Sequence, residues 1–234
     1  MTPASRIAGH RWWHTIDVAP GVSTPGGWDL RPMARRIPWP DTLARARCLD
    51  VGTMDGFWAF EMERRGATEV VGIDVGDSAQ RFRLAGQLRG SRAVWEGLNV
   101  YDLSRARMGQ FDLVFIGYTL NLLRDPIGAL QAIRDVCTGA VIVLDEISLA
   151  LTLLSRGPLA RFAPRPGYQE WWVFNAAGLR RALSVAGFEP KAESRLLKHR
   201  PGAGANVAEV PVGYRLRHAV GLAGVSLAIR GTPS

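Results

Sequence analysis

The stretch LDVGTMDGFWAFEM, residues 49–62, decides how this chain of 234 residues folds. An apolar run ends in an acid, two glycines follow with Thr-Met-Asp between them, and an amphipathic aromatic segment comes next. Gly52 would permit a tight turn, and Gly56 would let another group approach the backbone closely. A strand, a glycine loop and a helix in this order are typical of nucleotide-binding α/β folds.

Segments of alternating strand and helix character surround this loop. Short apolar runs predict strands at 47–51, 69–75, 92–100, 111–117, 139–147, 188–197 and 224–230. Helical spacing predicts helices at 28–37, 57–65, 78–89, 125–136 and 175–186. Nearly continuous apolar strands that alternate with helices indicate an α/β fold, with a parallel sheet covered on both faces.

Composition divides the chain into two parts. Residues 1–45 are irregular and rich in Trp, Pro and Gly, and we expect them to form a lid on the substrate side. Residues 46–234 are expected to form the nucleotide-binding domain, with 149–174 and 198–223 as insertions or loops.

The charge and the cysteine content indicate the kind of partner and the cellular location to expect. The net charge is +8, but only Lys191 and Lys198 are lysines, and the arginines are scattered rather than gathered into a basic block. Two cysteines cannot build a disulfide framework, which favours a reducing, cytoplasmic location. No apolar stretch is long enough to span a membrane, so we expect a soluble protein.

The acids near the loop indicate which nucleotide it holds. Asp74 ends the next strand, where related folds place an acid on ribose hydroxyls. Met54 replaces the central glycine of the dinucleotide pattern, and Asp50 and Asp55 would repel a pyrophosphate. A cofactor with an ammonium group and no phosphate, such as S-adenosylmethionine, suits these acids, and a nicotinamide oxidoreductase is disfavoured.

On these residues the sequence resembles class I S-adenosylmethionine-dependent methyltransferases. LDVGTMDG is similar to the first motif of that family, and Leu98-Asn99-Val100 to its adenine-side segment. The resemblance implies a Rossmann-like sheet of seven strands in the order 3-2-1-4-5-7-6, with the last strand antiparallel. The cofactor contacts implied are Asp50, Gly52, Thr53, Gly56, Asp74, Val75, Asn99, Val100 and Gly117.

A narrower resemblance extends over residues 12–188. EGLNVYDL, FDLVFIGYTLNLLRDPIGAL and YQEWWVFNAAGLRRALSVAGFEP are similar in order and spacing to the tRNA wobble-uridine methyltransferase-like group and its small-molecule relatives. That group often shows Leu-Tyr-His-Leu after the fourth strand. Here Leu120-Asn121-Leu122 fills the last three positions, so the usual histidine is absent.

These observations favour O-methylation of a small molecule, such as a sugar or a specialised metabolite. A hydroxyl acceptor needs a general base, and the candidates are His14, Asp145 and Glu146. The candidate acceptor contacts are Tyr118, Asn121, Tyr168, Trp171, Trp172 and Asn175. No metal is expected, since no cluster has ligand spacing.

Two alternatives stay open at this point, and so does the oligomeric state. The first alternative is modification of tRNA, which the positive charge supports. The second is a cofactor-binding partner subunit without catalytic activity, which the missing glycine and histidine suggest.

Overall fold

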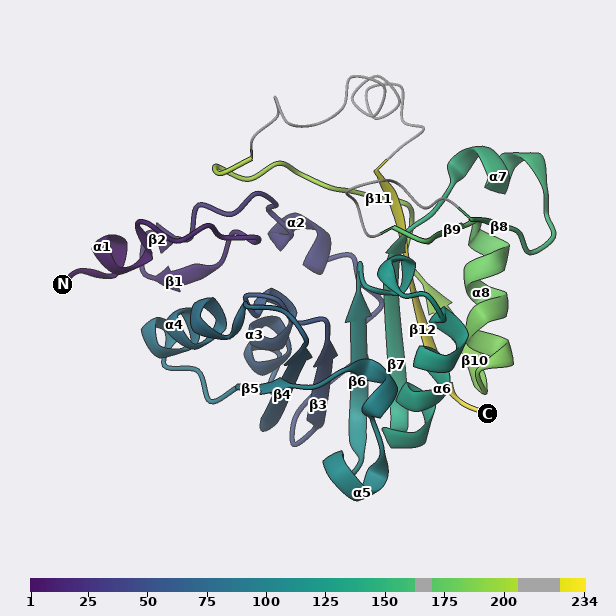
Figure 1. The fold of residues 1–234 in the computed structure, drawn as a ribbon, viewed down its shortest axis with the longest axis horizontal. Coiled ribbons are helices and arrows are strands. Elements are labelled where there is room, and N and C mark those ends of the chain that lie inside the picture. The colour runs from purple at the N-terminus through teal and green to yellow at the C-terminus, as the bar shows by residue number, and fades with distance from the viewer. Residues whose placement is uncertain (163–169, 206–223) are drawn as a thin grey trace.

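The computed structural model describes residues 1–162, 170–205 and 224–234, and a mixed β-sheet forms its centre (Figure 1). The main path of the sheet follows the spatial order β10-β12-β7-β6-β3-β4-β5. The bounds of these strands are β3 Arg47–Val51, β4 Glu69–Asp74, β5 Val94–Gly97, β6 Phe111–Gly117, β7 Cys137–Glu146, β10 Phe188–Glu193 and β12 Val225–Pro233. The neighbours along the run β5-β4-β3-β6-β7 all pair in parallel, whereas β12 is antiparallel to β7 and β10. The predicted order 3-2-1-4-5-7-6 is therefore confirmed.

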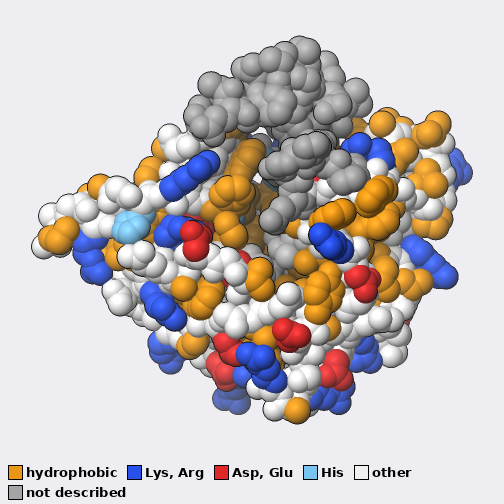
Figure 2. All heavy atoms as spheres, viewed as in Figure 1, with side chains coloured by type: hydrophobic (Ala, Val, Ile, Leu, Met, Phe, Trp, Pro, Cys, Tyr) orange, Lys and Arg blue, Asp and Glu red, His pale blue; other side chains and the backbone are white. Residues whose placement is uncertain are grey.

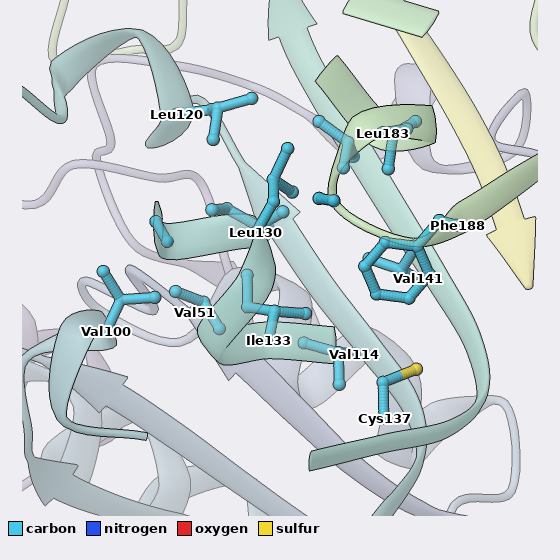
Figure 3. Packing of buried hydrophobic residues seen from close by; sticks show 14 of the residues in the cluster. Val51, Val100, Val114, Leu120, Leu130, Ile133, Cys137, Val141, Leu183 and Phe188 are labelled. Atoms are coloured by element: carbon cyan, nitrogen blue, oxygen red, sulfur yellow. The ribbon is translucent and has the colours of Figure 1, made fainter. Parts of the chain in front are cut away.

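Helices cover both faces of the sheet because successive strand residues point to opposite sides. Leu113 and Phe115 of β6 face a buried layer shared with α3 and α4, whereas Val114 and Ile116 face a layer shared with α6 and α8. The bounds of these helices are α3 Phe57–Arg64, α4 Ala79–Arg89, α6 Pro126–Val136 and α8 Ala176–Val185. Figure 3 shows the second layer, in which Leu130 of α6 lies among apolar side chains of the strands.

Side-chain caps fix where two of these helices begin. Asp125 accepts the backbone N–H of Gly128 at 2.8 Å, and Pro126 starts α6 with its fixed φ angle. Asn175 accepts the backbone N–H of Gly178 at 2.7 Å and caps α8 in the same way. These caps satisfy N–H groups that no helical turn can reach.

The N-terminal segment packs against the α3–α4 side of the sheet. Its elements are α1 Pro3–Ile7, β1 Asp17–Ala19, β2 Val22–Ser23 and α2 Arg31–Ala34. Trp12 and Met33 are buried in the layer that α3 and α4 share. The backbone N–H of Asp29 donates to Arg200 O at 2.9 Å, just after β11, Leu197–Lys198. Both α2 and β11 lie near the carboxyl ends of the central strands (Figure 1). The boundary between residues 45 and 46 stays a prediction.

Two predicted elements differ from those observed. The helix expected at 28–37 shortens to α2. Trp28 instead forms β-bridges with His14 and Pro201, and Pro38 disfavours a helical conformation at Ile37. The strand expected at 188–197 divides into β10 and β11, which both pair with β12.

Smaller elements complete the described chain. They are η1 Val100–Asp102, α5 Arg105–Met108, η2 Leu120–Leu122, α7 Leu149–Leu154, β8 Ala160–Phe162 and β9 Trp172–Phe174. Within the described ranges, none of the helices has the length and apolar character needed to cross a bilayer.

Candidate functional site

The loop between β3 and α3 depends on a close approach of two segments. Gly52 has a φ of +74°, and a Cβ atom there would lie 2.2 Å from the Oγ1 of Thr119. Gly56 has a φ of +98° and adjoins the rings of Phe60 and Phe82. Side chains at either glycine would separate the loop from its neighbours, which explains why the motif needs both.

Asp74, at the end of β4, holds the middle of this loop. One carboxylate oxygen accepts the backbone N–H of Met54 at 2.8 Å, and the other accepts that of Gly76 at 2.8 Å. Met54 has a φ of +49°, which is rare for a residue with a side chain. Val75 follows Asp74 and is 74% exposed. Asp74 is half-buried, and its two oxygens keep further lone pairs for a ligand.

Asp50 carries a buried oxygen atom that fits the ammonium group of S-adenosylmethionine. Its Oδ2 accepts the Thr53 hydroxyl at 2.7 Å and the backbone N–H of Ala59 at 3.0 Å. Among the described residues, no donor reaches its buried Oδ1. Burial raises the pKa of Asp50 to about 7. A cationic donor would satisfy this oxygen and favour the ionised carboxylate.

Asp55 serves a purpose that the sequence pattern did not indicate. Its Oδ2 accepts the backbone N–H groups of Trp13 at 2.7 Å and His14 at 2.9 Å. Its Oδ1 pairs with the His14 Nδ1, and the ring of His14 lies 5.8 Å from that of Phe57. Although burial opposes ionisation, His14 and the two N–H donors hold the pKa of Asp55 below its usual value. The charge of Asp55 therefore secures the N-terminal segment instead of facing a cofactor ammonium.

Tyr118 lies in a strained turn at the end of β6. Its φ is +54°, its hydroxyl donates to the Met33 sulfur at 2.9 Å, and its ring meets the edge of His199 at 4.5 Å. The preceding Gly117 leaves no room for a side chain, since a Cβ atom would lie 2.8 Å from Phe115. The turn thus brings the N-terminal segment and the end of β6 together.

Asn121 and Asp145 form a buried pair beyond β6 and β7. The backbone N–H of Asn121 donates to Asp145 at 3.0 Å, and its carbonyl accepts the N–H of Trp171 at 2.8 Å. The Oδ1 of Asn121 is buried, and none of the described donors reaches it. Burial raises the pKa of Asp145 to about 7. Glu146 lies next to it and accepts the backbone N–H of Gly224 at 3.1 Å.

Asn99, Val100 and Trp172 are further predicted contacts, located at η1 and on β9. Asn99 is exposed and caps its own turn by accepting the N–H of Tyr101 at 3.2 Å, while Val100 is buried below it. Trp172 packs against the α6–α8 layer and donates through Nε1 to Arg124 O at 3.1 Å. Tyr168 lies outside the described residues.

Asn175, one of the predicted acceptor contacts, caps α8 in the structure. It is 0% exposed, and its amide accepts the N–H groups of Leu159 at 2.9 Å and Gly178 at 2.7 Å. The same side chain donates to Gly157 O at 2.9 Å. Helix capping engages both ends of this amide, and a contact between Asn175 and an acceptor stays a prediction.

His199 was not predicted as a site residue. Its ring lies between Trp28, at 5.1 Å, and Tyr118, and its Nε2 lies 3.3 Å from the Ser226 hydroxyl. A single histidine at the start of a Gly- and Pro-rich connection carries no spacing signal that would reveal this position. The described residues contain no group of three or more metal-ligating side chains that could hold an ion.

Comparisons with known proteins agree with this geometry. The model of the family described as "Methyltransferase domain" matches residues 29–193. A ubiquinone biosynthesis O-methyltransferase of Neisseria meningitidis is 30% identical over 197 residues, covering 79% of each chain. Its counterpart from Thiobacillus denitrificans is 28% identical over 190 residues, covering 77% of this chain and 78% of that protein.

Solved structures share the fold. The N-terminal domain of EvdMO1, crystallised with S-adenosylhomocysteine and D-fucose, has a TM-score of 0.61 at 18% identity, covering 99% of this chain and 94% of that one. An S-adenosylmethionine-dependent methyltransferase from Mesorhizobium loti has a TM-score of 0.59 at 16% identity, covering 86% and 96%.

These findings confirm the predicted fold, enzyme class and cofactor. The narrower resemblance to the tRNA wobble-uridine group stays a prediction. With its family model, its relatives and its strand order in agreement, the chain belongs to the methyltransferase-domain family and is an S-adenosylmethionine-dependent methyltransferase.

Proposed function

We propose that this enzyme methylates a hydroxyl oxygen of a small molecule, with His14 as the general base. The observation that carries the proposal is the pairing of His14 with the buried Asp55, inside the loop that follows β3. Both relatives described above are named O-methyltransferases. The solved neighbour with D-fucose present makes a sugar hydroxyl one acceptor to test.

Asp55 would set the tautomer of His14. A carboxylate can only accept, so the hydrogen of a neutral imidazole lies on Nδ1, toward Asp55. The Nε2 lone pair is then the one that can take a proton from an acceptor hydroxyl. A carboxylate that orients a histidine in this way also stabilises the imidazolium that forms.

Cofactor residues would gather around the loop and the end of β4. Bound S-adenosylmethionine supplies an electrophilic methyl group on a sulfonium. Asp50 would accept from its ammonium group, Asp74 from its ribose hydroxyls, and the exposed Val75 offers an apolar surface beside Asp74. The remaining proposed contacts are Gly52, Thr53, Gly56, Asn99, Val100 and Gly117.

The acceptor would lie beyond the carboxyl ends of β6 and β7. The buried Oδ1 of Asn121 can accept from a donor group on the acceptor, and Asp145 and Glu146 are the second candidates for the base. Tyr118 and the two tryptophans Trp171 and Trp172 would bound the pocket. Residues 1–45 would close it as a lid, because they contribute His14.

A cytoplasmic location fits the two free, buried cysteines.

An acceptor screen that follows S-adenosylhomocysteine release tests the proposal. Phenolic, catecholic and sugar hydroxyls form the panel, and bulk tRNA is the competing substrate. With an acceptor that gives release, His14→Ala should lower kcat by about 100-fold or more. The kcat of Asp145→Asn, measured with the same acceptor, tests the second candidate for the base. Release only with tRNA, or full activity of His14→Ala, would contradict the proposal.

A further inference from the structure

A cavity of about 310 Å³ lies between α2, α3, α4 and the start of β1, apart from the loop residues that would hold the cofactor. Apolar side chains from Ile16, Phe57 and Phe60 line one part of it. The rest of the lining carries four guanidinium groups and two carboxylates: Arg31, Arg35, Arg64, Arg89, Asp17 and Glu61. Positive charge is therefore in excess within the cavity.

The two carboxylates already have arginine partners. Asp17 pairs with Arg31 at 2.7 Å. Glu61 pairs with Arg64 through both oxygens, at 2.8 and 2.7 Å, and accepts from Arg65 at 2.9 Å. Asp29, outside the lining, also pairs with Arg31 at 2.8 Å, so Asp17 offsets part of the charge of Arg89 as well. Positive charge stays in excess because Arg35 has no acid partner among the described residues.

Arg89 is a part-buried arginine whose guanidinium forms no ion pair with a carboxylate of the described residues. Its Nη1 donates to the backbone oxygen of Asp17, and its guanidinium lies 5.3 Å from the ring of Phe60. Its Nε is buried, and no acceptor reaches it within the described part of the chain. Although Asp17, Glu63 and Glu61 act in the other direction, burial lowers the pKa of Arg89. A cation withdrawn from water without a full set of acceptors is stabilised by a bound anion.

We propose that this cavity binds the phosphate group of a small phosphorylated ligand. Guanidinium groups match phosphate oxygens in geometry and charge, and the apolar wall can pack against the body of the ligand. Phe57 lines the cavity and also contacts the ring of His14, so the ligand would sit beside the proposed base.

Calorimetric titration with inorganic pyrophosphate, at constant ionic strength and with S-adenosylhomocysteine saturating, tests the proposal. The unmodified protein should bind one pyrophosphate, and Arg89→Met should weaken binding by about tenfold or more. Arg35→Gln should weaken it as well; Arg35 is exposed, so this variant should fold even where Arg89→Met does not. Arg83→Met is the matched control, since Arg83 shares α4 and lies 5.7 Å from the Trp95 ring, outside the cavity.

Three results would overturn the proposal. The first is no heat of binding in a preparation that binds S-adenosylhomocysteine. The second is an equal loss in Arg83→Met and Arg89→Met, which would mean a general effect of positive charge. The third is pyrophosphate binding seen only in a parallel titration without S-adenosylhomocysteine, which would place the anion in the cofactor site. Binding that survives in Arg83→Met and weakens in both cavity variants supports it.

Discussion

The backbone N–H of Met54 donates to the Asp74 carboxylate at 2.8 Å, which ties the glycine loop to the end of β4. Met54 has a φ of +49° in this turn, a conformation that glycine adopts without strain. We expect Met54→Gly to leave the free energy of unfolding unchanged or raise it by up to about 1 kcal/mol. Affinity for S-adenosylmethionine should be kept or improved, as calorimetry can measure.

Arg45→Gly is the matched control for that substitution. Arg45 has a φ of +66° and is exposed, away from the loop. It should change stability in the same way without changing cofactor affinity. A large loss of affinity in Met54→Gly alone would show that the thioether side chain itself packs on the cofactor.

Gly52→Ala should be strongly destabilising. The new Cβ atom would lie 2.2 Å from the Thr119 Oγ1, and the φ of +74° is unfavourable for alanine. We expect a loss of about 3 kcal/mol or more in urea unfolding. Gly21→Ala measures the cost of the unfavourable φ alone, because Gly21 has a φ of +70° and its added Cβ atom would have nothing within 4 Å. It should cost about 1 kcal/mol; equal losses at the two sites would rule out the close approach as the cause.

Cofactor affinity should depend on pH through Asp50. Burial raises the pKa of this carboxyl to about 7, and an ammonium group near it favours the ionised form. Below about pH 7 the free protein holds Asp50 protonated, so binding must release a proton and affinity falls as pH falls. Calorimetry from pH 6 to 8.5 measures this slope. Asp50→Asn should remove most of the slope, and an unchanged slope would assign it to another group.

Loss of the Asp55 carboxylate should release the N-terminal segment. Asp55→Ala leaves the part-buried N–H of Trp13 and the buried N–H of His14 without their acceptor. We expect a loss of about 3 kcal/mol in unfolding free energy, with earlier proteolysis before residue 45. Asp41→Ala is the control, since Asp41 is exposed. Equal protease resistance in both variants would show that other contacts hold the segment.

The sheet and its cofactor loop were predictable because their signals are local. Apolar runs mark the strands, and the glycines with Asp74 mark the turn at the point where the strand order reverses. The N-terminal contacts had no such signal. Asp55 meets His14 across a separation of 41 residues, and neither residue type nor spacing encodes that distance.

The acceptor side was harder to predict for a related reason. Asn175 belongs to a segment that resembles an acceptor-binding motif, yet hydrogen bonds to Gly178 and Leu159 make it a cap. A capping asparagine and a substrate-binding asparagine look alike in sequence, because both precede a helix. His199 reaches the site because β11 pairs with β12 and the chain after β11 pairs with the N-terminal segment, both of which are long-range contacts.

Calorimetric titration of the purified protein with S-adenosylmethionine and S-adenosylhomocysteine is the most direct test of the central claim. Both should bind with one site per chain, and Asp74→Ala should weaken binding by about tenfold or more. Asp77→Ala, whose carboxylate is 94% exposed, should bind as the unmodified protein does. A folded protein that binds neither compound would contradict the assignment of this chain as an S-adenosylmethionine-dependent methyltransferase.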